Sequence, residues 1–122
     1  MNEFSMNPLK LDKEEVIAVT VGYPKTRLMS LTVPKVGYLM CGMLNVEMLD
    51  KLHAERKIIA AQFTGIDKVD DLLTAQARQV TKEAERAGIH PGMTGRQIID
   101  IMLKIKKDME VREAAGDSGR EG

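Results

Sequence analysis

The chain has 122 residues, of which 43% are apolar and 30% are charged, and its 18 basic and 18 acidic residues cancel. This length is that of one domain, and the composition is that of an ordinary globular protein. A protein that binds nucleic acid needs a local excess of lysine and arginine to neutralise phosphates, and the sequence has no such block, so nucleic acid is not an expected partner.

The first half of the chain predicts a β meander. Residues 1–13 are polar, contain Pro8 and show no period, so we expect a partly disordered lead-in. The segment V-I-A-V-T-V-G-Y, which follows Glu15, is rich in β-branched residues, and such residues favour a strand. A second extended segment covers Arg27 to Val33. A short break that contains Pro24 separates these two segments, and a second break, which contains Pro34, separates the second segment from a third that begins at Val36. Connections this short allow only antiparallel neighbours.

The stretch from Val36 to Gly65 predicts a strand, a crossover helix and a strand. Asn45 occupies an N-cap position before a helical V-E-M-L-D-K-L, and the apolar run Ile58 to Phe63 is typical of a buried strand. A helical crossover between two strands of one sheet predicts that the strands are parallel.

The second half predicts helices. We expect a short helix within Ile66 to Ala75, and a second helix with Ala77, Val80, Ala84 and Ala87 on its apolar side. Thr94 and Gln97 have the spacing of a capping box at the start of a last, longer helix. Residues 113–122 are small and polar, and we expect a disordered tail. The sequence therefore predicts a single α+β domain over residues 14–112, with a three-strand antiparallel meander, one β-α-β crossover strand, and helices packed on one face of the mixed sheet.

Cys41 is the only cysteine, and it has two interpretations. It lies at the end of a predicted strand, beside Gly42 and before a helix N-terminus, where a thiolate nucleophile would be favoured. However, no histidine or aspartate lies near it in the sequence, and free cysteine is among the most buried residue types. The alternatives are a catalytic thiol and a small core residue.

Polar residues on tight connections provide a second candidate site. Lys25, Thr26 and Arg27 follow Pro24 at the break between the first two predicted strands, and Arg96 lies two residues after the capping Thr94 of the last helix. Such residues are most often simply solvated, but loops held by a sheet are also where binding groups concentrate. Neither zinc-ligand spacing nor a phosphate-binding glycine motif is present, so the sequence predicts no metal and no cofactor.

The expected compartment follows from the single cysteine and from hydropathy. One cysteine gives no internal disulfide, the N-terminal residues do not resemble a signal peptide, and no apolar stretch is long enough to cross a bilayer. We therefore expect a cytoplasmic protein with no membrane partner.

Three blocks of sequence resemble a known family. They are Y-P-K-T-R-L-M from Tyr23, G-Y-L-M-C-G-M-L-N-V from Gly37, and G-I-H-P-G-M-T-G-R from Gly88. In this order they are similar to the YunC-like family of small bacterial and archaeal domains of unknown function, in which Asp is common where this chain has Asn45. The resemblance implies an α+β fold and assembly into tetramers through the N-terminal β region, and it implies no known activity.

The strand residues themselves are compatible with such an assembly, because apolar side chains lie on both sides of the first two predicted strands and the helices can cover only one side. The first hypothesis is therefore a homo-oligomer, and the alternative is a small-molecule-binding protein or enzyme that uses Cys41. Whether the protein is an enzyme stays open. The candidate interface residues are Ile17, Val19, Val21, Leu28, Leu31 and Val33.

Overall fold

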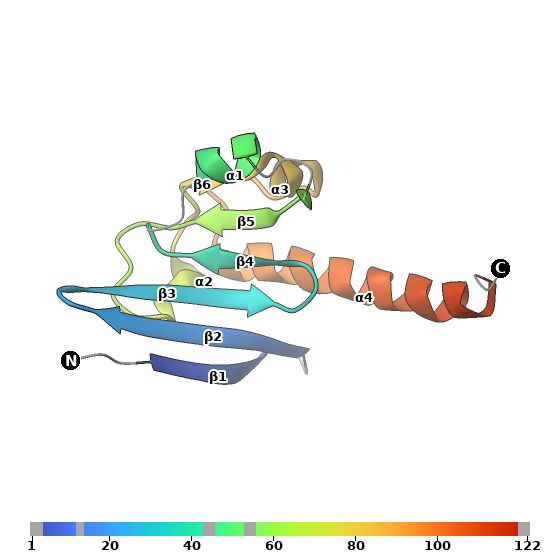
Figure 1. Ribbon diagram of the computed structural model, residues 1–122, viewed down its shortest axis with the longest axis horizontal. Helices are drawn as coiled ribbons and strands as arrows, with labels where there is room; N and C mark the ends of the chain where they lie inside the picture. Colours follow the sequence, from blue (N-terminus) through green and yellow to red (C-terminus); the bar gives the residue numbers. More distant parts are fainter. Residues whose placement is uncertain (1–3, 12–13, 43–45, 53–55, 120–122) are drawn as a thin grey trace.

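The computed structural model describes residues 4–11, 14–42, 46–52 and 56–119, and it consists of six strands and four helices (Figure 1). The predicted N-cap at Asn45 and the predicted helix residue His53 lie outside these ranges. The elements, in chain order, are β1 (Phe4–Leu11), β2 (Glu14–Tyr23), β3 (Thr26–Val33), β4 (Gly37–Met40), α1 (Val46–Leu52), β5 (Ile59–Gln62), α2 (Asp71–Thr74), β6 (Gln79–Val80), α3 (Lys82–Arg86) and α4 (Gly95–Gly119).

The strands form one mixed sheet in the order β1-β2-β3-β4-β5-β6. All neighbouring pairs are antiparallel except β4 and β5, which are parallel and joined through α1. The predicted α+β class, the antiparallel meander and the parallel crossover strand are confirmed. The sheet is wider than expected, because β1 adds to one edge and β6 to the other.

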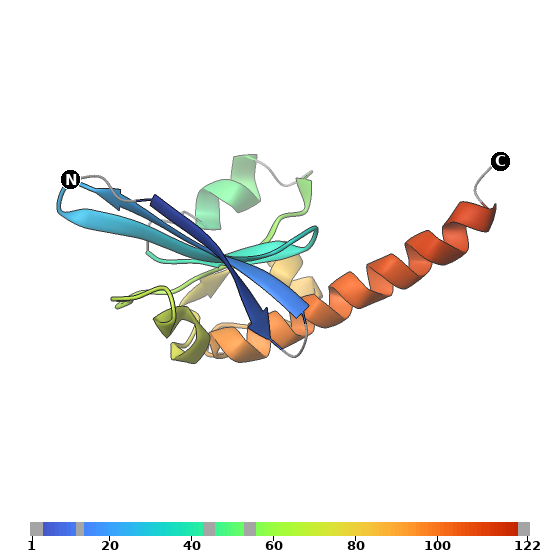
Figure 2. The same cartoon turned by 90° about the horizontal axis from the view of Figure 1, so that it is seen from below.

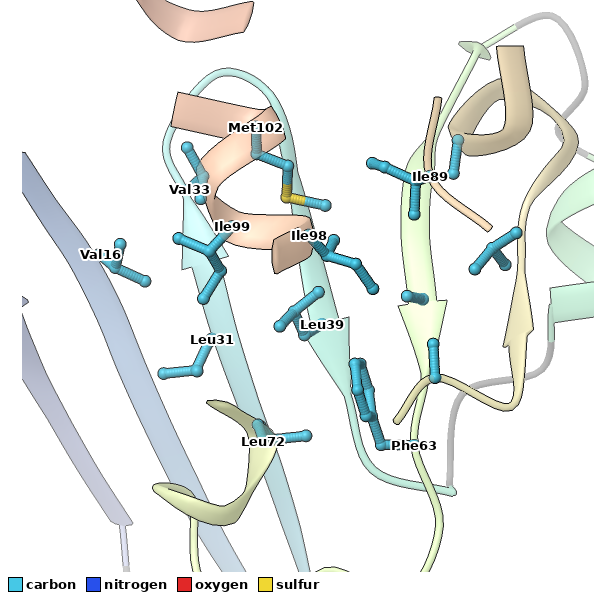
Figure 3. Close-up of a cluster of buried hydrophobic side chains, with 14 of the residues drawn as sticks. Val16, Leu31, Val33, Leu39, Phe63, Leu72, Ile89, Ile98, Ile99 and Met102 are labelled. Carbon is cyan, nitrogen blue, oxygen red and sulfur yellow. The ribbon is translucent and has the colours of Figure 1, made fainter. Parts of the chain in front are cut away.

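The core lies between the sheet and the helices α2, α3 and α4. Leu31 of β3 and Leu39 of β4 pack there with Ile98 and Ile99 of α4, and all four are almost fully buried (Figure 3). The prediction of helices on one face needs one change: α1 lies on the opposite face of the sheet (Figure 2). There its Val46 packs in a small separate cluster with Ala60, Tyr38, Met40, Leu49 and Ile58.

Side chains alternate between the two faces along β2, as predicted. Val16 is fully buried in the core and Ala18 packs against it, whereas Ile17, Val19 and Val21 point to the opposite face and are half-buried. Leu28 on β3 pairs with Val21, and Met6 on β1 pairs with Val19, so both belong to this second face. We call Met6, Ile17, Val19, Val21 and Leu28 the open face.

Two turns of the sheet place a lysine in the left-handed region. Lys25 in the β2–β3 hairpin has φ 65°, and Lys35 in the β3–β4 turn has φ 72°; each follows a proline. Proline followed by a left-handed residue is the pattern of a type II turn, and the Val36 amide donates to the Val33 carbonyl at 3.1 Å in the second turn. Glycine is the usual residue at that position, and another residue there costs roughly 1 kcal/mol.

The structure differs from the predicted boundaries at both ends of the chain. Residues 4–11, which were expected in the lead-in, form β1 on the edge of the sheet, which is the place in a sheet where proline is tolerated. At the other end α4 continues to Gly119, into the segment that was expected to be disordered.

The helix predicted around Ala77 to Ala87 is shorter than expected, because β6 takes its first part. Thr81 separates the two elements: its buried hydroxyl accepts from the Ala84 amide at 3.2 Å, which caps α3, and donates to the Ile58 carbonyl at 2.7 Å. The predicted helix stop at Gly88 is confirmed by its φ of 95°.

The capping box before α4 is also confirmed. The Thr94 amide donates to the Gln97 side chain at 2.9 Å, and the Gln97 amide donates to the Thr94 hydroxyl at 3.2 Å. The pair sets the first turn of α4 against α2.

We expect Gly95→Ala to destabilise the fold, because a methyl group on Gly95 would overlap the backbone carbonyl of Leu72 in α2. Alanine normally favours a helix, but overpacking against backbone costs about 1–3 kcal/mol, and we expect that cost to prevail. Chemical denaturation measures the change. Gly42→Ala is the control, since the nearest atom to its methyl group would be a Thr64 methyl at 3.7 Å. Equal stabilities of the two variants would contradict the close packing of α2 on α4.

Candidate functional site

Three segments that are distant in the sequence meet at one end of the sheet. The β2–β3 hairpin turns there, and the parallel strands β4 and β5 both end there (left in Figure 1). The loop that leads from β5 to α2 begins at the same place. Ligands in open sheets often bind beyond the carboxyl ends of parallel strands, because the departing loops leave a crevice there.

A hollow of about 260 Å³ lies at this end of the sheet. We call it the strand-end hollow. Its floor includes the Cys41 thiol, and its rim includes polar side chains of the hairpin and of the β5–α2 loop. Its lining residues are Thr26, Arg27, Met29, Cys41, Gly42, Thr64, Gly65 and Ile66.

Cys41 is only 6% exposed, and its sulfur is engaged by β3. The Met29 amide donates to Sγ at 3.4 Å, and the thiol donates to the Arg27 carbonyl at 3.8 Å. The Cys41 amide in turn donates to the Met29 carbonyl at 3.0 Å. The sulfur thus takes the place of a backbone acceptor where β4 leaves the ladder, which is a structural role.

A second hollow of about 340 Å³ adjoins the first and shares Thr26, Arg27, Met29 and Ile66 with it. We call it the hairpin hollow, and it adds Lys25 and Asp67 to the lining. Arg27 and Asp67 form an exposed ion pair with 3.7 Å between nitrogen and oxygen, which joins the hairpin to the β5–α2 loop.

Asp71 holds this loop in place. The Lys68 amide donates to its carboxylate at 3.0 Å and the Asp67 amide donates at 3.1 Å. These two backbone hydrogen bonds, first that from Lys68, lower the pKa of Asp71 below its ordinary value. The carboxylate is therefore ionised at neutral pH, and the loop that carries Asp67 is anchored to the start of α2.

Of the five predicted site residues, the structure brings four together. Cys41 lines the strand-end hollow, Thr26 lines both hollows, and Lys25 lines the hairpin hollow. Arg96 lines neither of them, and its Nε lies 3.2 Å from Asp100 on the same helix. The prediction that Arg96 joins this site is therefore wrong.

Arg27, which the sequence singled out together with Lys25 and Thr26, lines both hollows. Thr64 and Asp67 also belong to the site, although the sequence did not single them out. The available signal was a glycine shortly after each of the two parallel strands: Gly42 follows the end of β4 by two residues, and Gly65 follows the end of β5 by three. His90, the histidine within the described ranges, lines neither hollow, and the carboxylate of Asp67 in the hairpin hollow is paired with Arg27.

The predicted interface residues separate into two sets. Ile17, Val19, Val21 and Leu28 lie on the open face, but Leu31 and Val33 are each 1% exposed and point into the core of the subunit (Figure 3). The prediction that these two take part in an interface is therefore wrong: their positions on β3 place them toward α4.

Elsewhere in the described part of the chain, a hollow of about 190 Å³ lies between α1 and α3. Its two acids are already engaged: Asp50 accepts from the Lys82 amide at 3.0 Å, and Glu83 pairs with Arg86 at 2.8 Å. Within the same described ranges, no cluster of three histidine, cysteine or acidic residues could hold a metal ion. None of the helices described combines the length and the apolar character that crossing a membrane requires.

Comparison with known proteins places the fold and the sequence in one group. Residues 40–102 match the family described as "Domain of unknown function (DUF1805)". The chain is 38% identical over 100 residues to the uncharacterized protein YunC of Bacillus subtilis, and this match covers 82% of this chain and 98% of YunC. The crystal structure of a protein of unknown function, TA1206 from Thermoplasma acidophilum, has a TM-score of 0.73 with 27% identity, and the match covers 83% of this chain and 94% of that one. The resemblance to the YunC-like family is confirmed.

We expect Cys41→Ala to lower the free energy of unfolding by about 1–3 kcal/mol, because the Met29 amide loses its acceptor in a buried position. Amide hydrogen exchange locates the effect. The Met29 amide should exchange faster in the variant, whereas the amide of residue 41 keeps its bond to the Met29 carbonyl and its protection. Unchanged protection of Met29 would show that the sulfur is not its acceptor.

Proposed function

This chain belongs to the DUF1805 family of unknown function, and we propose that it acts as a homo-oligomer joined through the open face of its N-terminal sheet. The observation that carries the proposal is the pattern of β2. In its middle, the outward residues Ile17, Val19 and Val21 are all apolar, while Thr20 lies on the inward side. A sheet face in contact with water normally carries polar residues, so this face has the composition of a buried one.

The surroundings of the open face support the same proposal. Met6 on β1 is 57% exposed and Leu28 is half-buried, which extends the apolar surface across three strands. Of the helices described, α1 is the one on this side of the sheet, and it packs on β4 and β5 rather than on β2 (Figure 2). A contiguous apolar patch of this kind marks an interaction surface. A second copy is the proposed partner, in a closed symmetric assembly that we expect to be a tetramer.

Val19→Glu should dissociate the assembly, because it places a charge in the middle of the open face. Sedimentation measures the mass, and we expect a shift from a multiple of 13.6 kDa to the 13.6 kDa chain with the circular dichroism spectrum unchanged. Val111→Glu is the matched control, since Val111 is 63% exposed on α4 and should leave the mass unchanged.

Leu31→Glu provides a contrast on the neighbouring strand. Since Leu31 lies in the core, we expect this variant to unfold rather than to dissociate. A wild-type protein that sediments as a monomer at micromolar concentration would remove the proposal.

A second candidate function is the binding or conversion of a small molecule in the strand-end hollow. The observation that favours it is the meeting of Cys41, Thr26 and Arg27 at the ends of two parallel strands. The thiol would act as a polar contact or as a nucleophile.

The rate of reaction with a thiol reagent tests the nucleophile. If Cys41 takes part in chemistry, the folded protein should react faster than it unfolds, and Cys41→Ala, which removes the only thiol, should not react at all. Reaction limited by the unfolding rate would leave Cys41 with its structural role alone.

A further inference from the structure

The two proline–lysine turns provide a comparison within one molecule. Lys25 and Lys35 both occupy a left-handed position after a proline, and both accept the same backbone cost where glycine would have none. Backbone strain of this kind persists where the side chain serves a purpose. The question is therefore what each ammonium group contacts.

Lys35 has an internal partner. Its Nζ lies 3.9 Å from the Glu113 carboxylate of α4, so its side chain joins the β3–β4 turn to the long helix. For Lys25, by contrast, no carboxylate among the residues described lies within ion-pair distance of the ammonium group. Instead, Lys25 lines the hairpin hollow.

The charges around the hairpin hollow leave one positive charge without a partner. The lining contains two cations, Lys25 and Arg27, and one carboxylate, that of Asp67. Asp67 is committed to Arg27 at 3.7 Å. The Lys25 ammonium is therefore the group whose charge a ligand would neutralise.

We propose that the joined hairpin and strand-end hollows bind a small oxyanion, a phosphate or a carboxylate, through the Lys25 ammonium. The hydroxyls of Thr26 and Thr64 line the hollow and can donate hydrogen bonds to such a group. At Gly65, which has φ 73°, nothing lies within 4 Å of the place where a Cβ would be, so a ligand can approach the backbone there. This inference rests on the second candidate function, and it names the ligand chemistry of that site.

The combined volume suits a small ligand. The two hollows, of about 260 and 340 Å³, share four lining residues and are both open to solvent, so an oxyanion can enter with part of a larger molecule attached. Cys41 lines the strand-end hollow, which adjoins the hollow that Lys25 lines.

The experiment is a titration of the full chain with inorganic phosphate and, separately, with acetate, at constant ionic strength set with sodium chloride. Amide resonances of Thr26, Gly42 and Gly65 report binding and its place. We expect saturable shifts at these residues with one of the two anions, and the stronger of the two identifies phosphate or carboxylate as the preferred group. No saturable shift with either anion would overturn the inference.

Lys25→Gly and Lys35→Gly form a matched pair of variants. Both should raise the melting temperature, because glycine removes the backbone cost at the same turn position. Lys25→Gly should weaken anion binding about tenfold or more, whereas Lys35→Gly should retain the wild-type affinity. Equal weakening in both variants would overturn the inference, since it would show a general effect of net charge.

The thiol measurement distinguishes this inference from the function on which it rests. If Cys41 reacts rapidly in the folded protein but neither anion binds, the small-molecule site stands and the oxyanion assignment alone fails. Anion binding that is lost in Lys25→Gly, together with reaction of Cys41 only on unfolding, supports an oxyanion site without a nucleophile.

Discussion

Apolar side chains on both faces of β2 are the constraint on which the rest of this structure depends. On one face, Val16, Leu31 and Val33 are buried by α4, which provides the core of the subunit. On the other face, Ile17, Val19 and Val21 have no helix of the described chain packed on them as α4 packs on the core side (Figure 2). Burial of apolar area is the main favourable term in folding and in association, so the same driving force that seats α4 acts on the second face.

The parallel pair β4–β5 determines where a ligand could bind. A helical crossover is needed to join parallel strands, so the chain leaves the sheet after Cys41 and again after Phe63 at the same end. The hairpin between β2 and β3 projects over that end because β3 is antiparallel to β4. The site is thus a consequence of the topology, and its polar residues come from loops that the sheet holds rigidly.

The two proposed roles of the N-terminal strands do not compete for surface. The open face lies on the broad side of the sheet, opposite α4, and the hollows lie at the ends of its strands. Lys25 and Leu28 are only three residues apart in the sequence, yet one is at the tip of the hairpin and the other is on the broad face. An oligomer could therefore form while the hollows stay accessible from the ends of the strands.

Much of this architecture was determined by local sequence. The period-two pattern of β2, the capping box of Thr94 and Gln97, and the stop at Gly88 predict their elements correctly, because each depends on the conformational preference of a few adjacent residues. The sequence also identified Cys41, Lys25, Thr26 and Arg27 as residues of interest.

Only the tertiary structure decided the rest, because it depends on partners that are distant in the chain. β1 forms because it pairs with β2, and β6 forms because it pairs with β5. The local sequence pointed elsewhere in both places, since Pro8 indicated a loose lead-in and the spacing of Ala77 to Ala87 indicated a helix. The assignment of Leu31 to the core and of Val19 to the open face required knowledge of which side α4 covers. The meeting of Lys25 with Arg27, Asp67 and Cys41, and the exclusion of Arg96, follow from the strand order, since residues far apart in sequence become neighbours only when the sheet forms.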